Sequence, residues 1–268
     1  MPLDIFQAAE HLSISVSGYL YGTRRGAEFC QVCTTPVDSS YAYCLACNGN
    51  SRAASLNSTQ LADLVVPLVY IDDEPQSKLL MHGYKGDQVG PEPQKELLLN
   101  VALMSALGLL IHRTCIENAG SPLTALSFVP STHGRPNHPI RGIANFAGIH
   151  SGLPVVEAKY VGPLPSSRGY NPAHYQILPN SVDCRHVLLI DDTWTSGGSA
   201  QSVASQFKLT GSISVTILVV GRWLRKGWSA SASFMESQMK QNPYSPYDCP
   251  VSGTGTCSAS LSSSRPSR

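Results

Sequence analysis

The sequence has 268 residues, which is long enough for one large α/β domain with a small appended module. Hydrophobic residues make up 42% of the chain, so a packed core is expected and bulk disorder is excluded. The formal net charge of +1 argues against general attraction to nucleic acids or membranes. The N-terminus lacks a basic start, and the most apolar segment, 97–111, is too short to span a bilayer. We therefore expect a cytoplasmic protein without membrane contact.

Two Cys-x-x-Cys pairs, Cys30/Cys33 and Cys44/Cys47, lie near the N-terminus with ten residues between them. Each pair can place two thiolates on one tight turn, and two such turns complete a tetrahedral Zn²⁺ site. Zinc is favoured over disulfides because the chain has no secretory signal, and because the short segment needs a metal to supply its folding energy. We predict a structural zinc ribbon over about residues 28–50, with all four ligands from the protein and no open position for catalysis.

The rest of the chain alternates between strand and helix patterns, after 29 residues without clear periodicity. The patterns predict a strand over 61–69, a helix over 96–115, a strand over 123–129, a helix over 140–151 and a strand over 153–160. Residues 161–181 show no periodicity, and loops of this length in compact domains are usually functional or disordered. A strand from His186, a helix over 199–209 and a last strand over 213–220 follow.

The most informative stretch is 186–200, HVLLIDDTWTSGGSA. Its apolar run, Val187–Ile190, has no polar alternation, which is typical of a strand buried on both faces of a parallel sheet. Asp191 and Asp192 come where this strand should end. A loop of small residues then leads into the helix, and Gly197 and Gly198 would let its backbone approach a ligand closely.

Each part of this stretch has a chemical use. Ligands of parallel sheets bind at the carboxyl ends of the strands, and backbone N–H groups at a helix N-terminus form an anion site suited to phosphate. The hydroxyls of Thr195, Ser196 and Ser199 add donors. The acidic pair repels phosphate but suits sugar hydroxyls, or a Mg²⁺ ion that bridges to further phosphate. A phosphate held beside a polyol indicates a ribose 5-phosphate.

Two other interpretations were weighed. The stretch could be a strand that ends in a capped helix, with Asp and Ser satisfying helix N–H groups. It could also be the acidic strand of a phosphate-loop NTPase, but that fold needs a Gly-x-x-x-x-Gly-Lys-Ser/Thr run, which the sequence lacks.

Residues 187–199 resemble the signature of the type I phosphoribosyltransferases. Together with the preceding Cys pairs, Lys78–Asp87 resembles the ComF-like branch of that family, in which a Cys-pair module precedes a Lys-Tyr-x-Gly-Asp-like segment. The resemblance implies an α/β fold with a parallel sheet flanked by helices and a small N-terminal zinc ribbon. It also implies that Asp191 and Asp192 are catalytic and that the 5-phosphate is bound by Thr193, Thr195, Ser196, Gly197, Gly198 and Ser199.

The resemblance implies three further groups of site residues. A loop after the strand 123–129 would hold pyrophosphate through Ser131 and Arg135. A mobile loop would close over the site and carry Lys159 or Arg168 as its cation. Trp223 would stack on the acceptor base. The mobile segment lacks the Gln- and Arg-rich pattern that is frequent in the ComF-like branch.

Several of these residues have plainer interpretations. Lys85 could be a solvated turn residue, Trp223 could cover the edge of the sheet, and His133 and His138 could be surface side chains without a role. Cys249 and Cys257 could bind a metal, dock on the zinc module or remain free thiols.

These patterns divide the chain into an N-terminal segment with the zinc ribbon (1–57), a phosphoribosyltransferase-like domain (58–248) and a Cys-containing, Ser-rich tail (249–268) that is largely disordered. The expected activity is transfer of a 5-phosphoribosyl group between phosphoribosyl pyrophosphate and a nucleobase or amine, with Mg²⁺ as cofactor and zinc in a structural role. The alternative is a non-catalytic, ComF-like protein that senses nucleotides or assists DNA uptake. Binding of single-stranded DNA is expected only under that alternative, and a homodimer stays open.

Overall fold

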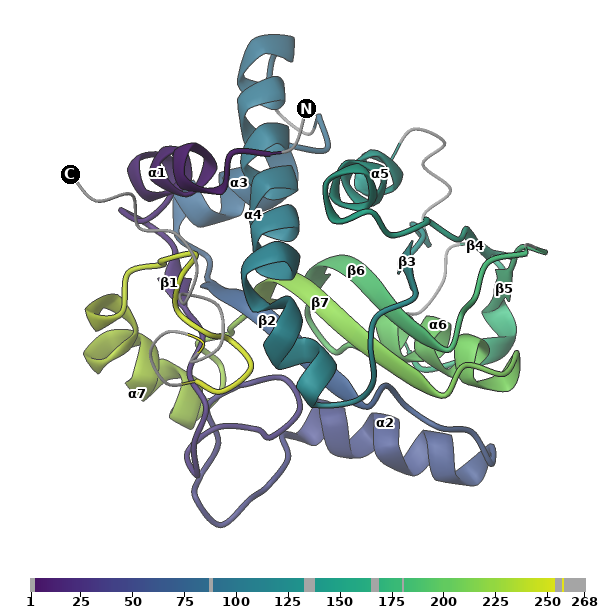
Figure 1. Ribbon diagram of the computed structural model, residues 1–268. Helices are drawn as coiled ribbons and strands as arrows, with labels where there is room; N and C mark the ends of the chain where they lie inside the picture. The colour runs from purple at the N-terminus through teal and green to yellow at the C-terminus, as the bar shows by residue number, and fades with distance from the viewer. Residues whose placement is uncertain are drawn as a thin grey trace.

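A five-stranded sheet lies at the centre of the computed structural model, which describes residues 3–86, 89–132, 138–164, 169–179, 181–253 and 257 (Figure 1). Across the sheet, the strands are β1 (Tyr21–Gly22), β2 (Leu64–Ile71), β7 (Ser214–Trp223), β6 (His186–Trp194) and β3 (Ala125–Phe128). β2, β7, β6 and β3 are parallel, whereas β1 is antiparallel to β2. A separate antiparallel pair is formed by β4 (Ala158–Tyr160) and β5 (Tyr175–Ile177).

Helices cover both faces of the sheet. One face packs against α1 (Ile5–Ser15), α3 (Pro75–Gly83), α4 (Pro91–Asn118) and α5 (Ile140–Ser151). The opposite face packs against α6 (Gly198–Leu209). The remaining helices are α2 (Leu45–Leu56), α7 (Ser229–Ser237) and the short 3₁₀ turns η1 (Pro172–His174) and η2 (Met239–Gln241).

Strand β6 shows why its sequence lacks polar alternation. Leu188 and Ile190 are buried in the core beneath α4 and α5, whereas Val187 and Leu189 are buried in the core shared with α6. Both faces of the strand are therefore covered, as expected for a parallel sheet with helices on each side. The predicted fold class is confirmed: the chain is an α/β protein with a mainly parallel sheet flanked by helices, and a buried four-cysteine cluster precedes its parallel strands.

Some predicted boundaries are wrong. β6 does not end before the acidic pair but continues to Trp194, because β7 pairs with it as far as Arg222. The strand predicted over 153–160 is reduced to β4, and Val155 makes only an isolated bridge to Leu126. η1 and β5 lie within the segment 161–181 that was predicted to be irregular.

Helix α4 is longer than predicted at both ends. Its start lies at Pro91 because proline is tolerated in the first turn of a helix. By length and composition alone, the whole helix is long enough to cross a membrane. The expectation from the sequence, which considered only residues 97–111, is therefore wrong for the complete helix. However, every residue from Asn100 to Leu109 is buried within the protein. The apolar character of α4 is that of a helix covered on all sides in a core.

The N-terminal segment also carries structure that the sequence analysis missed. α1 begins after Asp4, whose side chain accepts hydrogen bonds from the backbone N–H groups of Phe6 and Gln7. The helix packs on α4, where His11 Nε2 lies 3.0 Å from Asn100 Oδ1. Through α1 and β1, the residues before the cysteine cluster contribute to the main core and to the central sheet.

Candidate active site

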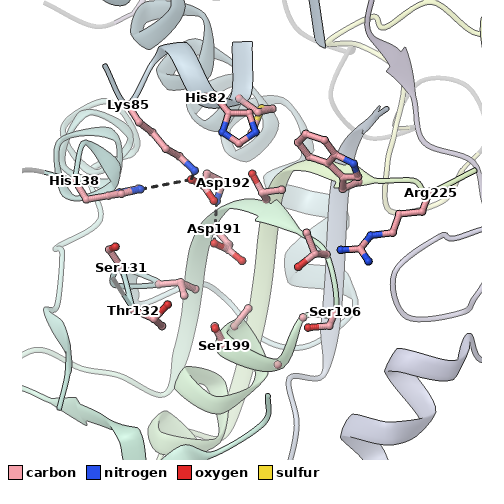
Figure 2. A pocket seen from close by; sticks show the side chains of 18 of the residues that line it. His82, Lys85, Ser131, Thr132, His138, Asp191, Asp192, Ser196, Ser199 and Arg225 are labelled. Carbon is pink, nitrogen blue, oxygen red and sulfur yellow. Dashed lines mark hydrogen bonds and ion pairs between the residues drawn. The ribbon is translucent and has the colours of Figure 1, made fainter. Parts of the chain in front are cut away.

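A cavity of about 590 Å³ opens at the carboxyl ends of β2, β3, β6 and β7 (Figure 2). After β3 the chain leads into α5 on one face of the sheet, and after β6 it leads into α6 on the other. Neighbouring parallel strands whose connections diverge in this way leave a crevice between them, which is where ligands bind in open α/β sheets. The volume of the cavity is within the usual range for small-molecule sites.

Asp192 is the most strongly paired carboxylate in the cavity. It is 8% exposed. Its Oδ2 accepts a hydrogen bond from Tyr84 Oη and forms an ion pair with Lys85 Nζ at 2.7 Å. His138 Nε2 is 3.8 Å from the same oxygen. Burial alone would raise the pKa of Asp192, but Lys85, Tyr84 and His138 together lower it to about 2. The carboxylate is therefore ionised at neutral pH.

Asp191 is also buried, with 9% of its surface exposed, and its Oδ1 accepts the backbone N–H of Asp192 at 3.0 Å. Because side chains alternate along a strand, Asp191 faces the α6 side of the sheet. Tyr175 lies close on this side: burial and the charge of Asp191 raise the pKa of its phenol to about 12, although a hydrogen bond with Ser199 acts against them. The two carboxylates thus reach the cavity from opposite sides of β6.

The loop between β6 and α6 turns around a buried tryptophan. Gly197 has φ +76°, and a Cβ atom at this position would overlap the indole ring of Trp194, which has no exposed surface. Only glycine satisfies both conditions without strain. The first residues of α6 line the cavity, and the first N–H groups of a helix have no partner within the helix. This end of the cavity is therefore suited to an anion.

The four cysteines of the predicted zinc ribbon form a buried cluster, and their sulfur atoms all lie within 4.8 Å of one another. Cys33 Sγ and Cys44 Sγ are 3.7 Å apart. Four thiolates at a Zn–S distance of about 2.3 Å around a tetrahedral ion are separated by about 3.8 Å. The residues and their spacing therefore fit a structural zinc ion, bound by Cys30, Cys33, Cys44 and Cys47.

The cysteine cluster is linked by hydrogen bonds to the loop before α6. Thr35 Oγ1 is 3.1 Å from Cys33 Sγ and accepts Arg222 Nε at 2.6 Å. The same guanidinium donates through Nη1 to the carbonyl oxygens of Trp194 at 2.8 Å and Thr195 at 3.1 Å. These bonds fix the positions of two carbonyl groups at the start of the loop. Neither Arg222 nor its role was foreseen, because its partners come from distant parts of the chain.

The structure brings most of the predicted site residues to one cavity. Its lining includes Ser131, Asp191, Asp192, Thr193, Thr195, Ser196, Gly197, Gly198, Ser199 and Trp223. The ring of Trp223 packs edge-on against His82 at 5.8 Å between centroids. Lys159 lies on the exposed side of β4 and is absent from the described residues that line the cavity. Arg135, Arg168 and His133 lie outside the described residues.

Several residues in or directly beside the cavity were not assigned to the site from the sequence. Tyr84 and Lys85 were noticed only as part of a family-like segment, and the solvated-turn interpretation of Lys85 is wrong because its side chain is only 17% exposed and paired with Asp192. His138 is likewise packed against Tyr84 and is no surface imidazole without contacts. Two basic residues after β7, Arg225 and Lys226, also line the cavity. Their position in a run of aromatic and basic residues, 222–228, is the sequence feature that could have indicated this role.

No protein-family model matches the sequence, and no curated protein matches it. Solved structures similar to this chain include adenine phosphoribosyltransferase from Saccharomyces cerevisiae, at 16% identity over 58% of this chain and 78% of that chain, with a TM-score of 0.32. Adenine phosphoribosyltransferase from Leishmania tarentolae matches at 16% identity over 64% and 84%, with a TM-score of 0.33. A hypoxanthine phosphoribosyltransferase from Staphylococcus aureus matches at 12% identity over 61% and 90%, with a TM-score of 0.30.

Proposed function

We propose that this chain is a phosphoribosyltransferase, which transfers a 5-phosphoribosyl group between phosphoribosyl pyrophosphate and a nucleobase or amine. The observation that supports this proposal is that the acidic pair on β6 and the N-terminal turn of α6 line the same cavity, at the point where the connections after β3 and β6 diverge. One end of the cavity suits a phosphate and the neighbouring part suits a polyol. A ribose 5-phosphate presents both groups.

The 5-phosphate would be bound by the loop before α6. Backbone N–H groups of the loop and of the first turn of α6 would donate to its oxygens, and the hydroxyls of Thr195, Ser196 and Ser199 would add further donors. Arg225 and Lys226 line the cavity as well, and they add positive charge near its mouth. The loop contains no carboxylate, so nothing in it repels the phosphate.

The ribose hydroxyls would be bound by Asp191 and Asp192. A carboxylate that stays ionised accepts hydrogen bonds from hydroxyls more strongly than a neutral group. Lys85 and Tyr84 keep Asp192 in that form, because they lower its pKa to about 2 against the effect of burial. Lys85 would also place a positive charge close to the sugar, where it can attract the pyrophosphate that leaves.

The cavity also has the oxygen ligands that Mg²⁺ prefers. The carboxylates of Asp73, Asp191 and Asp192 line it, and hard divalent cations bind such oxygens together with substrate phosphates. Since Lys85 is already paired with Asp192, we assign Asp191 and Asp73 as the residues that would hold the ion. When bound, Mg²⁺ would neutralise the charge of the pyrophosphate. Ser131, which lines the cavity after β3, would donate to the pyrophosphate oxygens.

The acceptor would bind beside Trp223. Its ring lines the cavity and is fixed by the edge-on contact with His82, so it offers a rigid apolar surface next to the sugar site. Such a surface favours a planar nucleobase over a flexible amine. The zinc ion would have a structural role, because the described cluster provides four protein ligands.

The second candidate is a non-catalytic, ComF-like protein that binds the same ligand as a sensor or in DNA uptake. One observation favours it: the segment between α5 and β6 lacks the Gln- and Arg-rich pattern that is frequent in the ComF-like branch, and Lys159 is exposed on β4.

An assay of pyrophosphate release would separate the two candidates. The protein is incubated with phosphoribosyl pyrophosphate, Mg²⁺ and each member of a panel of nucleobases and amines, and binding of the same ligand is measured by titration calorimetry. Pyrophosphate release that depends on an acceptor supports the enzyme. Binding without release, together with binding of single-stranded DNA, supports the sensor. Failure to bind either phosphoribosyl pyrophosphate or ribose 5-phosphate contradicts both.

A further inference from the structure

A second group of cysteines lies far from the cavity, where the C-terminal segment crosses the last turns of α4. His112 and Cys115 are three residues apart on α4, so both project from one face of the helix. Cys249 and Cys257 come from the C-terminal segment, which folds back so that both thiols are buried against this face. None of these four residues belongs to the zinc ribbon or to the candidate active site.

Three members of this group have the mutual distances of a ligand set. The ligand atoms of His112, Cys249 and Cys257 all lie within 4.8 Å of one another, and His112 Nδ1 is 3.0 Å from Cys257 Sγ. These three residues are no more than 5% exposed. The fourth residue, Cys115, lies on the same face of α4 and forms side-chain hydrogen bonds with Cys257 and Cys249, although its sulfur is not within 4.8 Å of all three other ligand atoms.

The imidazole of His112 is oriented as a metal ligand. Its Nε2 lies 2.9 Å from the carbonyl oxygen of Pro246, and since a carbonyl can only accept, Nε2 carries the proton. Nδ1 is then the unprotonated nitrogen, and it faces the thiols. Histidines that bind metals are usually held by such a hydrogen bond from the other ring nitrogen to a backbone carbonyl.

The thiol of Cys249 is placed where a thiolate is stabilised. The backbone N–H of Ser252 donates to its sulfur at 3.5 Å. Thiolates are the form in which cysteine binds metals.

We propose that His112, Cys249 and Cys257 form a second structural zinc site, which the neighbouring Cys115 completes by turning its side chain towards the ion, and that this site fastens the C-terminal segment to α4. Three thiolates and one imidazole are a common ligand set for structural Zn²⁺, and their soft donors exclude Mg²⁺ and Ca²⁺. A tetrahedral ion separates a nitrogen and a sulfur ligand by about 3.5 Å, so the contact between His112 and Cys257 would widen by about half an ångström. With four protein ligands, the site has no open position and no catalytic role.

The site is independent of the zinc ribbon, so the two can be removed separately. Protein expressed with zinc and purified with reductant should contain about two zinc ions per chain by elemental analysis. Cys257→Ser should lose one ion and keep the other, and Cys44→Ser should do the same. The combined variant should contain none. Cys184→Ser is the matched control, because Cys184 belongs to neither group and its loss should leave the zinc content unchanged.

A measurement on the unaltered protein covers the case in which a variant does not fold. After denaturation without reductant and with a chelator, all eight cysteines should react with a thiol reagent, and zinc should be released during the reaction. A disulfide between Cys249 and Cys257 would leave two fewer reactive thiols and overturn the proposal. A content of about one zinc ion per chain in the unaltered protein, or an unchanged content in folded Cys257→Ser, would also overturn it.

Discussion

The side-chain amide of Asn50 donates a hydrogen bond at 2.9 Å to the carbonyl oxygen of Ser196. Asn50 lies on α2, the helix that begins directly after Cys44 of the four-cysteine cluster, and Ser196 lies in the loop before α6. Together with Arg222, this bond ties the cluster to the part of the cavity that we assign to phosphate. The four-cysteine cluster and α2 do not line the phosphate end of the cavity, but they can determine the shape of the loop that does.

The first prediction concerns this bond. Asn50→Ala should weaken binding of ribose 5-phosphate about fivefold, because a neutral hydrogen bond contributes about 1 kcal/mol and its loss lets the loop relax. Titration calorimetry measures the effect. Asn48→Ala is the control, since Asn48 is an exposed residue of the same helix. Equal losses in the two variants would show that α2 does not act on the loop through Asn50.

The second prediction concerns the zinc ion proposed for the four-cysteine cluster. Cys44→Ser should weaken binding of ribose 5-phosphate by about tenfold, because Thr35 would no longer hold Arg222 against the loop carbonyls. Cys257→Ser, which disturbs the distant cysteine group, should bind like the parent. Calorimetry on both folded variants checks this difference. If Cys257→Ser loses as much affinity, the effect is one of general stability.

The third prediction concerns Gly197. Gly197→Ala should lower the free energy of unfolding by about 1–3 kcal/mol, because alanine is strained at positive φ and its Cβ would overlap Trp194. Urea unfolding measures the change, and phosphate binding should weaken in parallel. Gly142→Ala serves as the control, since nothing lies within 4 Å of a Cβ at this position of α5. The control should not lower stability.

The fourth prediction concerns acid sensitivity. Because the folded-state pKa of Asp192 is lowered to about 2, its contribution to stability is fully present above the ordinary carboxylate pKa of about 3.9 and is lost as the pH falls towards 2. The contribution is about 2 kcal/mol. Lys85→Met should therefore lower the free energy of unfolding at neutral pH and reduce its dependence on pH in the acid range.

Urea unfolding at a series of pH values tests this expectation. Lys95→Met is the matched control, because the ion pair between Lys95 and Glu92 is largely exposed and should contribute nothing measurable. If Lys85→Met and Lys95→Met have the same acid dependence, Lys85 does not set the pKa of Asp192.

The features that could be predicted from the sequence are those encoded locally. The elements around Asp191 follow one another directly in the sequence: strand, acidic pair, loop and helix. Each Cys-x-x-Cys pair of the cysteine cluster is also contiguous, so residue spacing was enough to identify both features. Helix α1 was missed, although Asp4 was an available capping signal.

The contacts that depend on topology could not be read from the sequence. Tyr84 and Asp192 are 108 residues apart, and Asn50 and Ser196 are 146 apart. Each pair meets only because β2, β7 and β6 pair side by side and because the cysteine cluster packs under α6. The same reason explains why Cys115 and His112 gave no signal: their partners lie at the other end of the chain.

The last prediction tests the acidic pair itself. Replacing both Asp191 and Asp192 by Asn keeps the size and hydrogen-bonding capacity of the side chains but removes their charge. A charge-assisted hydrogen bond contributes about 1.5–3 kcal/mol, so the double variant should bind phosphoribosyl pyrophosphate with Mg²⁺ at least about tenfold more weakly. Binding of inorganic phosphate should change little, because the loop before α6 is left intact.

The binding measurement is meaningful only if the variant stays folded, so its stability is measured as well. Asp192→Asn leaves Lys85 facing a neutral amide, so some loss of stability is expected and is measured by urea unfolding. Asp183→Asn is the control, since Asp183 pairs with Arg185 on the exposed surface and should leave binding unchanged. If the folded Asn pair binds phosphoribosyl pyrophosphate as tightly as the parent, the carboxylates serve only the packing of β6 against Lys85 and Tyr84, and the cavity does not hold a ribose.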